Sequence, residues 1–460
     1  MHFGWDLLWF IVGVSLLVTV HEFGHFWVAR KLGFKVLRFS VGFGKPLYKR
    51  IGKGPDHTEH VIASLPLGGY VKLVDERDGP VSASDQPRAY QSKHPWRRIL
   101  MLLAGPGANF IFAILVLWGL AWSLGIVHVK AEVDKVIIGS VADKAGLRAG
   151  DEVRSINGRD VFDQGDAALG LLDAVSDEGQ VVLGVRDRGG ADRTVTLNVP
   201  DPADRLRLTE PDRLYDGLGF HFWSRSPTAV IGEAAAGGPA AKAGLVAGDL
   251  IESVDGTPIR SFNEFADYVM ARPDTTMTVG VRRGTERFTR TMKTVRAEDH
   301  GRVVGRLMIK PSYETPAPIP DGMVTRDDAG PFASLRYSLD KAWQMTAVQA
   351  TFFVRMLTRK ISPKNLSSPI GIAGYAGDSA RAGFEPFLMF LVLISLSLGF
   401  LNLLPIPILD GGQIVFAITE WLKGSPLSER AQAVSWHAGL LMLVLLMGIA
   451  VFNDLSSGIG

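Results

Sequence analysis

A pattern suited to hydrolytic chemistry stands near the start of the chain, where residues 21–25 read His21-Glu22-Phe-Gly-His25. On a helix, residues four apart share a face, so both imidazoles can reach one zinc ion. Zinc lowers the pKa of a bound water from about 16 to about 7, and Glu22 is placed to take the proton. The pattern predicts a zinc site with Glu22 as general base and later general acid. A chance match on a core helix is the alternative.

The surroundings of the pattern favour the metal site over the chance match. Leu7 to Val20 carries no charged residue, and Phe23 to Ala29 continues apolar. Ionisable groups inside a membrane span are costly and usually functional. An unpaired His-Glu-His cluster would oppose insertion into the bilayer. This apolar run lacks a basic n-region and an Ala-x-Ala site, so we expect a retained helix and not a removed signal peptide.

Composition limits the classes of protein that the chain can belong to. The 460 residues predict two to four structural units. Long apolar runs beside ordinary charged stretches indicate a mixed membrane and soluble protein. The net charge of +2 and the lack of a basic arm argue against nucleic-acid binding. Cysteine is absent, which excludes thiolate ligands and leaves His, Asp or Glu to bind metal.

We expect a polytopic α-helical membrane protein with four transmembrane helices, a membrane-associated β-hairpin and two extracytoplasmic α+β domains. Each apolar span is long enough to cross about 30 Å of hydrocarbon. The predicted units are transmembrane segments at 1–30, 99–127, 386–410 and 431–453, cytoplasmic loops at 31–98 and 411–430, soluble domains at 128–222 and 223–312, a linker with an interfacial amphipathic helix at 313–385, and a periplasmic tail at 454–460.

Lysine and arginine predict the orientation in the membrane. Residues 1–6 contain neither, whereas residues 30–53 are rich in both. The positive-inside rule therefore places the amino terminus outside and the first loop in the cytoplasm. The two histidines then lie toward the cytoplasmic half of the membrane, with both termini and the soluble domains outside the cytoplasmic membrane.

A strand or hairpin is predicted within the first loop, where Ser64 to Leu73 combines β-favouring residues with the pair Gly68-Gly69. One interpretation is an ordinary surface hairpin. The other is an edge strand beside the metal. A helical substrate has its carbonyl groups hydrogen-bonded, so pairing an unwound segment with a strand edge would present an extended peptide for attack.

The third span supplies a candidate third ligand in Asn402-Leu-Leu-Pro405-Ile-Pro407-Ile-Leu-Asp410-Gly-Gly. The two prolines cannot continue a regular helix, so we expect the backbone to open there. Asp410 would then join the two histidines and leave one zinc position for water. The alternative for Asp410 is a helix N-cap. Asn402 could bind a substrate carbonyl or oxyanion, or could serve helix packing.

Small and polar residues also mark the second span, at Gly105, Pro106, Gly107 and Asn109. Close helix packing is the default interpretation for these residues. Asn109 is in addition a candidate to support a metal ligand by hydrogen bonding.

A repeated string lies between the second and third spans. Residues 140–158 match residues 238–256, with Ala-Gly-Leu-x-x-Gly-Asp in both. Two copies of one fold are inferred. Each copy resembles the PDZ domain, and Gly217-Leu218-Gly219-Phe220 resembles the carboxylate-binding loop of that domain in a circularly permuted arrangement. The pair could bind peptides at a strand edge or act as rigid gates. Leu335 to Ile361 then predicts an amphipathic helix, either interfacial or simply packed.

Taken together, H-E-x-x-H, N-x-x-P-x-P-x-x-D-G and the PDZ-like repeats resemble the site-2 protease family of intramembrane zinc metalloproteases, peptidase family M50. The strings at 41–45, 69–77, 365–370 and 452–454 are similar to those of bacterial members with tandem PDZ domains. The resemblance covers essentially the whole chain, and it implies one Zn²⁺ per chain, held by His21, His25 and Asp410.

The resemblance also implies how substrates are handled. It matches Gly68, Gly69, Tyr70, Val71 and Lys72 to a membrane-reentrant β-hairpin that engages substrate. It matches Asn402, Pro405 and Pro407 to a substrate-handling segment. The implied substrates are single-span membrane proteins, such as an anti-sigma factor already trimmed by another protease, and remnant signal peptides in the bacterial inner membrane, with the tandem PDZ domains as a size filter.

Two rival functions remain from the residues alone. A membrane-tethered zincin that cuts exposed loops would need a downstream Glu ligand, and we find no helix with such a ligand set. A non-catalytic PDZ scaffold with a structural metal would tolerate Glu22→Gln, whereas a hydrolase would lose turnover and keep its zinc.

Overall fold

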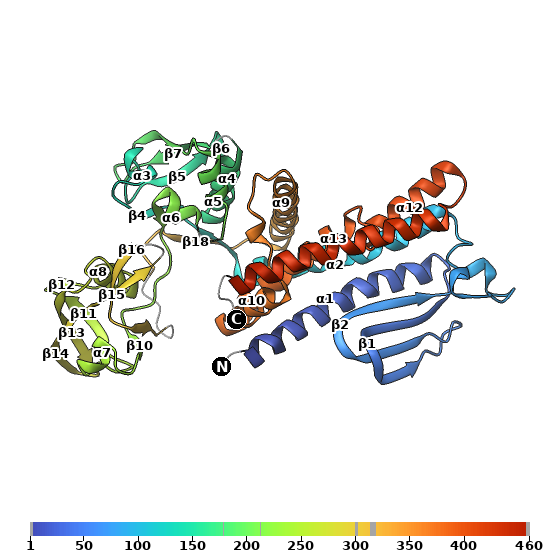
Figure 1. Ribbon diagram of the computed structural model, residues 1–460, viewed down its shortest axis with the longest axis horizontal. Coiled ribbons are helices and arrows are strands. Elements are labelled where there is room, and N and C mark those ends of the chain that lie inside the picture. The colour runs from blue at the N-terminus through green and yellow to red at the C-terminus, as the bar shows by residue number, and fades with distance from the viewer. Residues whose placement is uncertain (1–2, 178, 212, 300–301, 313–318, 457–460) are drawn as a thin grey trace.

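The computed structural model describes residues 3–177, 179–211, 213–299, 302–312 and 319–456. The molecule is elongated, with long helices and a β-sheet toward one end and two soluble units at the other (Figure 1). The first helix begins, and the last helix ends, at the end of the helices that is nearer the soluble units (Figure 1).

Four described helices are long and apolar enough to cross a membrane. They are α1 (Phe3–Lys31), α2 (Pro95–Leu124), α11 (Phe384–Leu403) and α13 (Glu429–Ser456). Close contact between the first two depends on Gly24, where a Cβ atom would lie 2.2 Å from the carbonyl oxygen of Ala104. The small residue therefore lets the two helix backbones approach, as is common in membrane proteins.

Two of the predicted spans have different bounds in the structure. Helix α2 replaces the predicted 99–127: His94 caps it, Pro95 occupies its first turn, and it ends before Gly125. The segment Ile126–Val129, apolar except for His128, forms strand β3 instead, paired with β18 (Val324–Asp327). The predicted 386–410 is also wrong at its end, because α11 stops at Leu403.

Strands β1 (Val36–Ile51) and β2 (Glu59–Leu73) form an antiparallel sheet beside α1 (Figure 1). The first half of β1 pairs on one side with Glu59–Ile62 and on the other with Gly69–Leu73. Within the described chain, no further strand pairs with Gly69–Leu73, so this segment is an edge. The Ser15 hydroxyl donates to the carbonyl of Pro66 at 3.0 Å and ties the sheet to α1. The predicted hairpin is thus part of a longer sheet.

The two soluble units share one strand order. A four-stranded sheet runs β6-β5-β7-β8 in the first and β12-β11-β13-β14 in the second, and each unit has its own apolar core. The first unit comprises β4 (Val133–Val136), α3 (Val141–Lys144), β5 (Glu152–Ile156), β6 (Arg159–Asp160), α4 (Gln164–Asp177), β7 (Gln180–Arg186), β8 (Asp192–Asn198), α5 (Pro202–Leu208), α6 (Leu214–Leu218) and β9 (Phe220–Phe222). The second comprises β10 (Ile231–Ala234), α7 (Pro239–Lys242), β11 (Leu250–Val254), β12 (Thr257–Pro258), α8 (Phe262–Met270), β13 (Thr276–Arg283), β14 (Glu286–Lys293), β15 (Val295–Asp299), β16 (Arg302–Arg306) and β17 (Ile309–Pro311).

Matching turns show why the repeated string folds the same way twice. Asn157 and Asp255 have φ of 47° and 48°, and each precedes a glycine with positive φ. Two left-handed residues in succession define the tight hairpin turn that Asn-Gly and Asp-Gly favour. The side-chain oxygen of Asn157 accepts from the Val182 amide, and that of Asp255 accepts from the Thr278 amide.

The segments around the third span contain more helix than predicted. Residues 411–430 are not a simple loop, because α12 (Asp410–Lys423) fills most of them. The predicted amphipathic helix is α9 (Pro331–Leu357), which packs on α2 and α11. It is followed by the short helices η3 (Pro363–Asn365) and α10 (Pro369–Ala382), which the apolar pattern does not predict. Two further short turns, η1 (Glu76–Asp78) and η2 (Gln86–Arg88), follow β2.

Parts of five predicted units lie outside the described residues. These are residues 1–2 of the first span, 178 and 212 of the first soluble domain, 300–301 of the second, 313–318 of the linker and 457–460 of the tail. The described part of that tail is the end of α13 and not an extended segment.

Candidate metal centre

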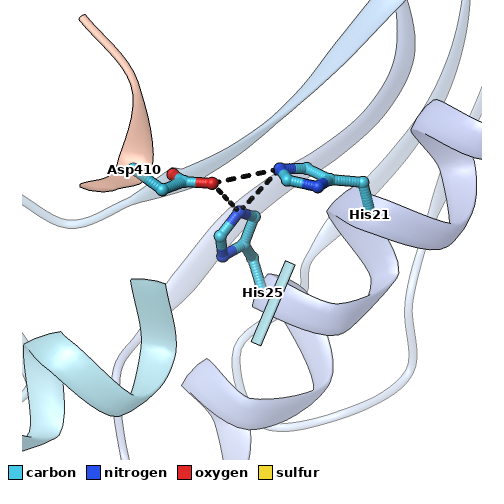
Figure 2. A group of neighbouring side chains, drawn as sticks. All are labelled: His21, His25 and Asp410. Carbon is cyan, nitrogen blue, oxygen red and sulfur yellow. Dashed lines mark hydrogen bonds and ion pairs between the residues drawn. The ribbon is translucent and has the colours of Figure 1, made fainter. Parts of the chain in front are cut away.

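Three side chains from two distant parts of the chain meet at one point (Figure 2). His21 and His25 project from α1, and Asp410 is the first residue of α12. The two Nε2 atoms lie 3.1 Å apart. Oδ2 of Asp410 lies 3.2 Å from Nε2 of His21 and 3.3 Å from Nε2 of His25. The three donor atoms therefore form a nearly equilateral triangle.

The triangle has the dimensions of one face of a zinc tetrahedron. Zinc bonds of about 2.0–2.1 Å at tetrahedral angles separate neighbouring ligand atoms by about 3.3 Å. Asp410 Oδ2 is also a buried atom with no hydrogen-bond partner. Such an atom is costly unless it has a partner or ligates a metal. Two imidazoles and a carboxylate fit zinc, and they leave a fourth position for water or substrate.

Local backbone features carry Asp410 to the histidines. After α11 ends, residues 404–409 are not helical, which follows from Pro405 and Pro407. Helix α12 then packs back on this connection, where a Cβ atom at Gly411 would lie 2.3 Å from the Leu404 carbonyl oxygen. The N-cap of α12 is Leu409, so the N-cap interpretation of Asp410 is wrong.

Helix α2 supports the two histidines from the opposite side. The carbonyl of Met101 lies 2.8 Å from Nδ1 of His25. Nδ2 of the fully buried Asn109 lies 3.4 Å from Nδ1 of His21. Gly105 has no side chain, and this leaves room for both Nε2 atoms. Sequence reasoning gave Gly105 only a packing role and missed Met101, because a backbone acceptor has no side-chain signature.

Glu22 lies between the metal centre and the edge strand. Its half-buried carboxyl group lies near the backbone amide of Val71. At Gly69, a Cβ atom would lie 3.0 Å from Cγ of Glu22 and 3.2 Å from Cγ1 of Val18. The candidate base and the predicted substrate-binding strand are therefore in direct contact.

The other predicted hairpin residues have separate contacts. Gly68 has φ of 142°, and a side chain there would overlap the ring of Phe43. The hydroxyl of Tyr70 accepts from Arg38 at 3.0 Å. Lys72 forms an ion pair of 3.4 Å with Asp78. The Arg38–Tyr70 hydrogen bond links the edge strand to β1, whereas the exposed Lys72–Asp78 pair links it only to the turn η1 that follows β2.

Asn402 and the two prolines lie before Asp410 in the chain. Asn402 is half-buried in the last turn of α11. The carbonyl of Pro407 accepts from the side-chain amide of Gln413 at 2.9 Å, and its ring is 3.2 Å from the position of a Cβ atom at Gly439 of α13. A role for Asn402, Pro405 and Pro407 in substrate binding stays a prediction.

The predicted carboxylate-binding loop is far from this centre, in the first soluble unit (Figure 1). Gly217 and Leu218 belong to α6, Gly219 ends that helix with φ of 83°, and Phe220 begins β9. The side chain of Leu208 packs against Gly217. Half of the predicted loop is thus helical, and α5, which carries Leu208, has no counterpart among the described residues of the second unit.

Comparison with known proteins places the chain in a family. The model of peptidase family M50 matches residues 9–446. The chain belongs to peptidase family M50. As an M50 peptidase it is a zinc metalloprotease, which argues against the scaffold alternative. The zincin alternative lacks support in the described residues, where Asp410 and not a Glu joins the two histidines.

Relatives of this M50 peptidase match over nearly their whole length. The chain is 37% identical to the regulator of sigma-E protease RseP of Salmonella typhimurium, over 98% of each protein. It is also 37% identical to RseP of Escherichia coli, over 99% of each protein. The same identity and coverage hold for a protein of Neisseria meningitidis that is named as a zinc metalloprotease without experimental proof. A solved PDZ domain of an SdrC-like protein from Listeria monocytogenes matches 20% of this chain and 92% of its own length, at 23% identity and a TM-score of 0.17.

Proposed function

We propose that this M50 peptidase hydrolyses peptide bonds within transmembrane segments of single-span membrane proteins, using one zinc ion held by His21, His25 and Asp410. The observation that carries the proposal is the triangle of three donor atoms on α1, a helix apolar enough to cross a membrane. A water-using site at this depth suits substrates that are themselves membrane helices.

The proposed chemistry assigns Glu22 to proton transfer. When bound, zinc supplies Lewis acidity and makes water nucleophilic at neutral pH. The Glu22 carboxylate takes the proton of the attacking water and returns it to the departing amine nitrogen. Its close approach to Gly69 places the carboxylate beside the edge strand. Asn402 is proposed to donate to the carbonyl oxygen as negative charge develops there.

The proposed substrate-binding surface is the edge segment Gly69–Leu73. Its outer side pairs with no other strand of the described chain, so its backbone groups are available to an added strand. A substrate helix must unwind before its carbonyl groups can react, and strand pairing replaces the hydrogen bonds that it loses. Contact between Glu22 and Gly69 would place the paired peptide next to the base.

The proposed orientation puts the metal centre toward the cytoplasm of a bacterium and the soluble units in the periplasm. Arg30 and Lys31 end α1, and the basic residues Lys93 and Arg97 flank the start of α2. The soluble units lie at the other end of these helices (Figure 1). From the resemblance to RseP, we propose a trimmed anti-sigma factor and remnant signal peptides as substrates.

The two soluble units are proposed to be permuted PDZ domains that exclude substrates with large periplasmic parts. Their common strand order and their position before α9 support this role. Deleting residues 131–311 should allow cleavage of a full-length substrate that the intact protein cleaves only after trimming. Unchanged discrimination between full-length and trimmed substrate would remove the size filter from the proposal.

The experiment that tests the catalytic proposal compares wild type, Glu22→Gln and Asp410→Ala. Cleavage of a detergent-solubilised single-span substrate is measured, and bound zinc is quantified in each purified protein. Glu22→Gln should keep zinc and lose cleavage, and Asp410→Ala should lose both. If Asp410→Ala keeps one zinc per chain and full activity, the proposed ligand set is wrong.

A further inference from the structure

One face of α2 is aligned with the metal centre. Met101, Gly105 and Asn109 are spaced four residues apart, so they share a face of the helix. Met101 lies at Nδ1 of His25 and Asn109 at Nδ1 of His21, while Gly105 between them has no side chain and leaves room for both Nε2 atoms. The Nε2 atoms are used by the proposed ligation, and the hydrogen-bond partners on α2 are at the two distal Nδ1 atoms.

The distal hydrogen bond of His25 fixes where its proton lies. A backbone carbonyl can only accept, so Nδ1 of His25 must be the donor to Met101. In the neutral imidazole the Nε2 lone pair is then free to face the metal. A distal acceptor of this kind is the usual partner of a metal-binding histidine.

His21 needs the same arrangement if its Nε2 atom is to bind metal. Its Nδ1 must then carry the proton and donate it to an acceptor. Among the described residues, the side-chain amide of Asn109 is the group hydrogen-bonded to this nitrogen, and its Oδ1 atom is buried without a partner. Rotating the amide by half a turn exchanges its oxygen and nitrogen and supplies the acceptor.

The position of the proton on His21 decides which way the side-chain amide of Asn109 is turned. The number of hydrogen bonds does not decide it. In either orientation one end of the Asn109 amide lacks a protein partner. Only the orientation with Oδ1 toward His21 is compatible with a protonated Nδ1. The backbone of Asn109 is held independently, because the hydroxyl of the buried Ser395 on α11 donates to its carbonyl at 2.9 Å.

We propose that Asn109 is a positioning residue for the metal centre: its side-chain oxygen accepts a hydrogen bond from Nδ1 of His21 and holds the imidazole with its Nε2 lone pair toward the metal. This inference rests on the proposed zinc site and extends it to α2. The role requires an acceptor at position 109 and makes no use of an amide donor.

The test measures zinc affinity of the full-length protein in detergent by competition with a chelator, together with thermal stability. Asn109→Leu should bind zinc about 10–100-fold more weakly, the usual cost of losing such a partner. Asn109→Asp, which keeps an acceptor, should stay within about threefold of wild type or bind more tightly. Asn109→Ala accompanies the Leu variant, so that an apolar variant is measured even if one of the two fails to fold.

Two control variants separate the possible failures. Ser395→Ala removes the hydrogen bond to the Asn109 backbone and should leave zinc affinity near that of wild type. His21→Ala should abolish stoichiometric zinc; if it does not, the proposed zinc site itself fails. If His21→Ala loses zinc but the apolar variants at 109 bind within twofold of wild type, or if Asn109→Asp weakens binding as much as they do, the acceptor role of Asn109 is overturned.

Discussion

Gly105 of α2 lies directly against Nε2 of His25, at a position where any side chain would clash with the imidazole ring. A Cβ atom at position 105 would lie 2.2 Å from Nε2 of His25 and 2.8 Å from Nε2 of His21. Real Cβ contacts of this length do not occur, so a side chain at this position and the ligand arrangement exclude each other. The absence of a side chain here is a requirement of the site and not merely of helix packing.

Gly105→Ala should therefore lose both zinc and cleavage. Alanine stabilises a helix by about 1 kcal/mol relative to glycine, so the helix itself should not suffer. Gly107→Ala is the matched control, because nothing lies within 4 Å of a Cβ atom at Gly107. Zinc content and cleavage are measured for both variants. Normal zinc in Gly105→Ala would contradict the geometry of the site.

Gly69→Ala should lower cleavage without removing zinc. Its Cβ atom would lie 2.8 Å from the Ser40 carbonyl oxygen and 3.0 Å from Cγ of Glu22, so the edge strand would have to move away from the base. A misplacement of about 1 Å can cost roughly 100-fold in rate. Single-turnover cleavage and zinc content are compared with Gly119→Ala, where a Cβ atom has nothing within 4 Å. Equal rates in the two variants would show that the strand position does not matter.

Removing the metal should loosen the helices around the centre and leave the soluble units unchanged. A ligand present at about 100 times its Kd stabilises the folded state by about 2.7 kcal/mol, and this contribution disappears on chelation. Hydrogen exchange should speed up near His21 on α1 and near Asp410 on α12. It should stay constant in β7 and β13, whose cores are separate. Cleavage should stop and return when zinc is restored. Protection that falls equally in all four segments would argue against a local metal site.

The metal centre could be predicted from the sequence because its parts have local signatures. The spacing of His21 and His25 places both on one helix face, and the prolines before Asp410 predict that the helix ends ahead of it. The turns at Asn157 and Asp255 were predictable for the same reason, since Asn-Gly and Asp-Gly favour a positive φ at both residues.

Other parts of the fold could not be read from the chain. Ile126 and Val127 continue the apolar pattern of α2, and they belong to a strand because Ile126–Val129 pairs with β18. The roles of Met101 and Gly105 depend on which helix faces which, and helix pairing is not encoded in the spacing of residues on one segment. The helical turn at Gly217 packs against Leu208, which comes from a helix without a counterpart among the described residues of the second unit, so the repeated string alone does not predict it.

The second soluble unit should lose stability in acid through Asp249. This fully buried carboxylate pairs with Arg283 at 2.6 Å and accepts from the Val246 amide at 2.9 Å. Burial raises the pKa of Asp249, but the guanidinium and the amide outweigh it, so the pKa lies below its ordinary value. A carboxyl whose pKa is lower in the folded state stabilises that state above its unfolded pKa of about 4, and this contribution is lost as the pH falls through the folded value.

Hydrogen exchange in β11 and β13, corrected for the intrinsic rate at each pH, measures this effect in the full-length protein. In wild type, the free energy of opening should be constant from neutral pH to about pH 5 and should fall below about pH 4. Asp249→Asn should lower it by about 1–3 kcal/mol at neutral pH, the cost of weakening buried hydrogen bonds to a charged group. The same variant should show a weaker dependence on pH, because the titrating carboxyl is gone. A decline in acid as steep as that of wild type would assign the effect to other carboxylates of the unit.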